Sequence, residues 1–120
     1  MIDRDSAPFR MTPVVFHVLL ALAEGDSHAY QIMKDIPTRT DGTLEVGPGS
    51  LHFTLSKLLD AGMVEGSDER PDPAQDDARR KYYRLTEYGR GVLRSEASLL
   101  ADIVDYASEQ GLVGGTGGGG

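Results

Sequence analysis

Residues 79–89 of the chain read Arg79-Arg80-Lys81-Tyr82-Tyr83-Arg84-Leu85-Thr86-Glu87-Tyr88-Gly89. The aromatic and apolar residues within Lys81 to Leu85 are typical of a β-strand. Thr86 follows directly and is a preferred helix N-cap, because its hydroxyl can accept a hydrogen bond from an amide of the first helical turn. Apolar residues at helical spacing continue to about Ser108. This stretch therefore predicts a strand that leads directly into a long C-terminal helix.

A second strand is predicted upstream of this one, at Met63-Val64-Glu65. Residues 67–78 separate the two strands and contain two prolines and many charged side chains, a composition typical of a loop. Tyr82 and Tyr83 alternate in direction along the later strand, so we expect one of them in the core and the other partly exposed. Two strands joined by such a loop form a hairpin with an extended tip, which is a wing.

The N-terminal half predicts three helices. Thr12 and Pro13 have the form of an N-cap and a first helical residue, and Gly25 ends the apolar run that they begin. Ser27 can cap a short second helix that Pro37 should end or kink, and Leu44-Glu45-Val46 is long enough for a short strand. The third helix is expected to begin at Gly47-Pro48 and to close at Gly62.

The third predicted helix has two contrasting faces. Its leucines, Leu51, Leu55, Leu58 and Leu59, form an apolar stripe that should face the core. The opposite face carries the candidate DNA-reading residues Ser50, Phe53, Ser56 and Lys57, with His52 at its flank. Hydroxyl and amine groups can bond base edges or phosphate, and Phe53 can pack on a thymine methyl group. The alternative is that Phe53 is a buried wedge against the second helix or the wing.

The net charge of −7 argues against a nucleic-acid partner, because phosphate binding depends on Lys and Arg. Residues 79–94, however, hold six basic residues and one acid. We expect two of the three residues Arg79, Arg80 and Lys81 to contact DNA phosphates, since neighbouring strand residues point to opposite faces. The alternative is that they pair with the acidic loop before them.

The chain resembles the PadR family of transcriptional regulators in four segments, Leu19–Gly25 with Ser27–Ile32, Val46–Leu51, Leu58–Val64 and Arg79–Gly89. The resemblance covers roughly residues 13–107. The resemblance implies a winged helix-turn-helix repressor that binds double-stranded DNA and dimerises through its C-terminal helix, and it permits a small apolar effector at the dimer interface. The sequence departs from the family pattern at His52-Phe53, where Tyr-Pro is usual, and at acidic residues in the wing loop.

Two apolar sets share the C-terminal helix and give it a wider apolar face than docking on a small domain requires. The spacing predicts a homodimer whose two recognition helices read a pseudo-palindrome. The residues predicted to form the dimer contact are Val92, Leu93, Leu99, Leu100, Ile103, Val104 and Tyr106.

The expected fold class is mainly α with a small β-hairpin wing, a winged helix-turn-helix with an added dimerisation helix. Residues 13–86 are assigned to the DNA-binding domain, 87–109 to the dimerisation helix and 110–120 to a disordered glycine-rich tail. The chain has no cysteine, and its longest apolar run is too short to cross a membrane, so a cytoplasmic protein is expected.

No catalytic residue, metal site or cofactor is predicted. The three histidines lack the spacing of a metal site, and no glycine-framed nucleophile is present. The sequence therefore predicts a DNA-binding transcriptional regulator and not an enzyme. The alternative from another class is a winged-helix protein-interaction module that does not bind DNA, which the net charge and the acidic wing loop favour.

Overall fold

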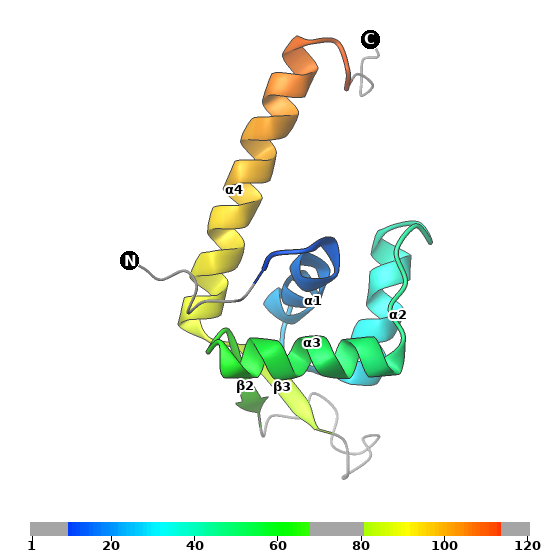
Figure 1. Cartoon of the computed structure of the whole chain (residues 1–120), viewed down its shortest axis with the longest axis vertical. Helices are drawn as coiled ribbons and strands as arrows, with labels where there is room; N and C mark the ends of the chain where they lie inside the picture. The colour runs from blue at the N-terminus through cyan, green and yellow to red at the C-terminus, as the bar shows by residue number, and fades with distance from the viewer. Residues whose placement is uncertain (1–9, 68–80, 114–120) are drawn as a thin grey trace.

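The computed structural model describes residues 10–67 and 81–113. Three helices and a small sheet form one body, and a long final helix projects from it (Figure 1). This arrangement confirms the predicted winged helix-turn-helix with a C-terminal helix. In chain order the elements are α1 (Pro13–Ala23), β1 (Ser27–His28), α2 (Ala29–Arg39), α3 (Pro48–Asp60), β2 (Val64–Ser67), β3 (Tyr82–Leu85) and α4 (Glu87–Glu109).

Helix α1 lies at the centre of the core, and its local chemistry fixes where it begins. The Thr12 hydroxyl accepts a hydrogen bond from the Val15 amide at 3.1 Å, and Pro13 occupies the first turn, where its missing N–H costs nothing. Val18 and Leu19 are fully buried. The core that forms around α1 joins residues of α1, α2, α3, β2, β3 and the start of α4.

The short strand was predicted at the wrong place. Residues 44–46 form no strand, and Leu44 bonds locally instead, its amide donating to the Thr40 hydroxyl at 3.1 Å. The strand is β1, which pairs antiparallel with β3, while β2 pairs with the other edge of β3. Because Ser27 belongs to β1, His28 caps α2 instead, and its Nδ1 accepts a hydrogen bond from the Gln31 amide at 3.2 Å.

The central position of β3 explains a second difference from the prediction. Tyr82 and Tyr83 are both buried, at 7% and 5% exposure, although only one was expected to be. Tyr83 joins the main core, and the Tyr82 ring lies edge-on to His28 with 5.1 Å between ring centroids. Both tyrosines are buried because β3 has a strand on each side and the His28 ring lies against the side chain of Tyr82.

Two smaller expectations for the helices need correction. Pro37 does not end α2, which continues to Arg39, since the φ that proline imposes is compatible with a helix and only its own amide bond is lost. Leu59 is 39% exposed, because it lies about 100° around α3 from Leu58, at the edge of the buried stripe. The stripe that faces the core is Leu51, Leu55 and Leu58.

Candidate nucleic-acid interface

Helix α3 presents one face to the core and the other to solvent. Leu51, Leu55 and Leu58 are almost completely buried, which fixes the rotation of the helix about its own axis. Its first turn is open: Gly47 is the N-cap without a side-chain bond, and Pro48 follows. The predicted DNA-reading residues Ser50, His52, Phe53, Ser56 and Lys57 are all exposed on the other side of the helix.

Phe53 is the most unusual side chain on this face. It is 65% exposed, so it is not the buried wedge considered as an alternative. The Lys57 ammonium lies 5.4 Å from the centre of the Phe53 ring, one helical turn further along. This cation–π contact holds an apolar ring and a positive charge side by side on the solvent face of α3. A surface of that kind can meet a thymine methyl group and a neighbouring phosphate together.

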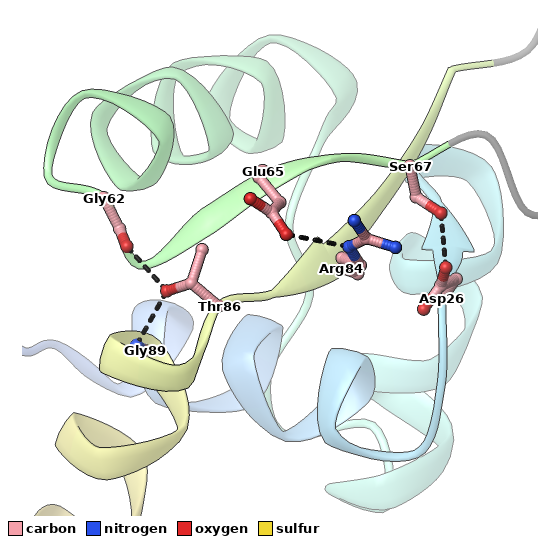
Figure 2. Close-up of polar contacts among 7 residues, drawn as sticks. All are labelled: Asp26, Gly62, Glu65, Ser67, Arg84, Thr86 and Gly89. Carbon is pink, nitrogen blue, oxygen red and sulfur yellow. Dashed lines mark hydrogen bonds and ion pairs between the residues drawn. The ribbon is translucent and has the colours of Figure 1, made fainter.

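The structure describes only part of the wing. Arg79, Arg80 and most of the wing loop lie outside the described residues. Lys81, directly before β3, is exposed. Arg84, on β3, donates to the Glu65 carboxylate on β2 at 2.8 Å, an ion pair across the hairpin that Figure 2 shows.

Hydrogen bonds also tie the hairpin to the helical body. At the far end of β2 the Ser67 hydroxyl donates to the Asp26 carboxylate, in the loop before β1 (Figure 2). At its near end the Thr86 hydroxyl donates to the Gly62 carbonyl at 2.6 Å and accepts from the Gly89 amide at 2.9 Å. Sequence reasoning identified Thr86 as a helix cap, but its second bond, to a residue 24 positions away, has no signature in the sequence.

The residues of helix α4 that are buried in the body lie near its beginning. Leu93 is buried in the core of the chain, and Val92 packs partly against that core. Leu93 therefore serves the fold of the single chain, while the dimer contact of the partly buried Val92 stays a prediction. The remaining predicted residues are 38–65% exposed on the projecting part of α4, and they are Leu99, Leu100, Ile103, Val104 and Tyr106.

An apolar hollow of about 340 Å³ lies where α1 meets α4. Its apolar walls are Met11, Pro13, Phe16 and Leu100, and Thr12, His17 and Glu96 complete the lining. Burial lowers the pKa of His17 below its usual value, and the charge of Arg39 lowers it further.

Within residues 10–67 and 81–113, no group of three or more acidic or histidine side chains is arranged to hold a metal ion. None of the helices described there is both long enough and apolar enough to cross a membrane.

Comparison with known proteins agrees with this architecture. A transcriptional regulator from Clostridium thermocellum is 24% identical, with a TM-score of 0.64 over 80% of this chain and 90% of that one. A PadR family regulator from Clostridium difficile is 19% identical, with a TM-score of 0.66 over 82% and 97%. A PadR-like transcription factor from Bacteroides fragilis is 21% identical, with a TM-score of 0.62 over 80% and 87%.

The PadR-like family of transcriptional regulators matches residues 18–95, well over half of the chain. The matched region includes α2, α3, the described wing strands and the buried beginning of α4. Its members regulate transcription, which implies DNA binding and is not an enzymatic activity. The chain belongs to the PadR-like family of transcriptional regulators.

Proposed function

We infer that this chain is a homodimeric repressor whose two α3 helices read the half-sites of a pseudo-palindromic operator. The observation that carries the inference is the α3 surface, on which the exposed Phe53 ring and the Lys57 ammonium lie opposite a fully buried leucine stripe. Buried leucines hold the helix rigidly, and a rigid helix with an adaptable polar and aromatic face suits the major groove.

The dimer is supported by the shape and exposure of α4. The stripe that begins with the buried Leu93 continues along the same side of the helix as the exposed Leu100 and Val104. A second copy packed along this stripe would remove it from water. Two recognition helices related by a two-fold axis would then contact half-sites about one helical turn of DNA apart.

The wing residues Arg79, Arg80 and Lys81 are proposed to supply phosphate contacts beside the groove. Of these, Lys81 is exposed at the start of β3, and the other two directly precede it in the chain. Their charge is suited to orientation and affinity and not to sequence readout. Access to chromosomal DNA also implies a cytoplasmic location.

A small apolar effector at the dimer interface is proposed to regulate the repressor. The hollow between α1 and α4 supports it, because its volume of about 340 Å³ falls within the range of small-molecule sites and its walls are mostly apolar. A molecule bound there would contact the exposed part of α4 through Leu100 and could change the pairing of the two subunits.

The test is selection of genomic DNA fragments by the purified full chain, followed by sequencing. We expect enriched fragments that share two related half-sites in opposite orientation. Lys57→Ala is the informative variant, and Lys34→Ala on α2, which also removes an exposed lysine, is its control. Enrichment that is equal for the wild type and Lys57→Ala would contradict the assignment of α3 as the reading helix.

The net charge of −7 favours one competing function, a winged-helix module that binds a protein partner. Such a module would enrich no DNA sequence in the same selection. The two functions are therefore separated by one experiment.

A further inference from the structure

The end of α3 and the beginning of α4 are joined by four residues that we call the α3–α4 junction: Gly62, Met63, Thr86 and Gly89. The Thr86 side chain donates to the Gly62 carbonyl at 2.6 Å and accepts from the Gly89 amide at 2.9 Å. The Thr86 amide donates to the Met63 carbonyl at 3.0 Å. One residue thus makes both a cap for α4 and two bonds to the segment that follows α3, as Figure 2 shows for its side chain.

Gly89 is required at the junction for space. A Cβ atom added there would lie 2.0 Å from the Met63 carbonyl oxygen and 2.8 Å from its carbonyl carbon. Both are backbone atoms, so a side chain at this position would have to push the two segments apart. The absence of a side chain at Gly89 lets the first turn of α4 rest directly on Met63.

The same two residues that receive α4 also terminate α3. The Gly62 amide donates to the Leu59 carbonyl at 3.1 Å, and the Met63 amide donates to the Leu58 carbonyl at 3.0 Å. With Gly62 at a φ of +78°, these two bonds form a Schellman motif at the end of α3. Only Ala61 separates the last residue of α3 from Gly62 and Met63, so the segment that closes α3 is also the segment on which α4 rests.

We propose that Thr86 and Gly89 are positioning residues that set the angle between the recognition helix and the dimer helix, and thereby the spacing of the two recognition helices. The 23 residues of α4 extend about 34 Å, so a tilt of about 10° at the junction moves the far end by about 6 Å. One base pair changes the half-site separation by only about 3.4 Å. The inference rests on the proposed dimer for its link to DNA.

The angle is tested by spin labels in the full chain, which has no native cysteine. Ser56→Cys on α3 and Asp102→Cys on α4 carry the two labels, and labelled chains are diluted into unlabelled ones so that the distance within one chain is measured. Thr86→Val keeps the shape of the side chain and removes both of its bonds, while Thr86→Ser keeps the bonds. Gly89→Ala is avoided because it threatens folding itself.

We expect Thr86→Val to broaden the α3–α4 distance distribution about twofold and Thr86→Ser to leave it unchanged. Thr12→Val is the matched control, because it removes the cap of α1 and leaves the junction intact. Broadening that is equal in Thr86→Val and Thr12→Val would overturn the inference, since loss of any helix cap would then explain it. An unchanged width in Thr86→Val would overturn it as well.

The link to DNA is tested by the affinities of the unlabelled variants for two duplexes. One is the duplex selected by the wild type, and the other is the same duplex with one base pair inserted between the half-sites. The wild type should prefer the original spacing by about tenfold, and Thr86→Val should reduce that preference to about threefold or less. A preference that Thr86→Val leaves intact would overturn the role in spacing. If the wild type selects no paired half-sites, the proposed function fails, while the spin-label measurement still decides whether the junction sets the angle.

Discussion

Phe53 is the residue on which the assignment of the reading helix depends. Phe53 is 65% exposed, and the Lys57 ammonium lies over the face of its ring, so removal of the ring leaves the core intact. We expect Phe53→Ala to cost about 1 to 3 kcal/mol at the cognate site and little at random DNA. The free energy of unfolding should change by less than about 0.5 kcal/mol. Affinity titrations on both duplexes and thermal melting measure the two effects.

Leu55→Ala on the same helix is the matched control for Phe53→Ala. Leu55 is 1% exposed, so its truncation should cost about 2 to 5 kcal/mol of folding free energy. A large loss of stability in Phe53→Ala with unaltered sequence preference would contradict the groove assignment.

His17 makes stability depend on pH. Burial and the charge of Arg39 lower the pKa of the folded-state imidazole below 6.5, its ordinary value. The unfolded chain therefore binds a proton as the pH falls through about 6.5, whereas the folded chain binds it only at lower pH. The stability contributed by the neutral imidazole is present above that window and is lost below it.

Melting curves of the wild type and His17→Gln between about pH 7.5 and pH 5.5 test this expectation. The carboxylates are the same in both proteins, so the difference in Tm loss between wild type and His17→Gln isolates the contribution of His17. The wild type should lose more Tm on acidification than His17→Gln does. Equal losses would show that the environment of His17 does not penalise its charged form.

At the scale of elements, the wing is predicted to supply charge and not sequence readout. Arg79→Ala and Arg80→Ala should each weaken binding to all duplexes by a similar factor and reduce the salt dependence of binding by about one phosphate contact. Competition between specific and random duplexes measures the preference. A changed preferred sequence with an unchanged salt slope would contradict the prediction.

Helix α4 is predicted to form the dimer through its exposed stripe. Replacement of both Leu100 and Val104 by Asp places two charges in that stripe, and should convert dimers to monomers at micromolar concentration while the buried Leu93 keeps α4 on its own core. Ser98→Asp is the control, because Ser98 is exposed about 160° around the helix from Leu100. Sedimentation should give a dimer for the control and the wild type. A monomeric wild type would contradict the prediction.

The elements that local chemistry defines were predictable from the sequence. Thr12-Pro13 and Thr86 mark helix starts whose hydrogen bonds lie within a few residues, and the period of the leucines in α3 gave its buried face. The exposed face of α3, with Phe53, followed from the same period.

The parts that depend on distant pairing could not be predicted. β1 has two residues and exists because β3 offers it a partner, so its own sequence carries no strand pattern. Tyr82 is buried for the same reason. Leu93 looks like the rest of the α4 stripe, and only the fold shows that its own core covers it. The second bond of Thr86 likewise requires Gly62 to lie nearby.

At the scale of the whole molecule, an acidic chain is proposed to bind a polyanion. Its net charge of −7 repels DNA, so binding must depend on local cations such as those in residues 79–94 and Lys57. Each phosphate that these residues neutralise releases counterions, which makes affinity fall as salt rises. A winged-helix module that binds a protein partner would not bind DNA, so this salt dependence would not be observed.

The central claim is tested most directly by the affinity of the full chain for its selected duplex as monovalent salt is raised from about 50 to 200 mM. For about four to six neutralised phosphates, the logarithm of the association constant should fall linearly with the logarithm of salt, with a slope of about −4 to −5. Binding that is absent at low salt, or whose slope is close to zero, would contradict the claim that this chain regulates transcription by binding DNA.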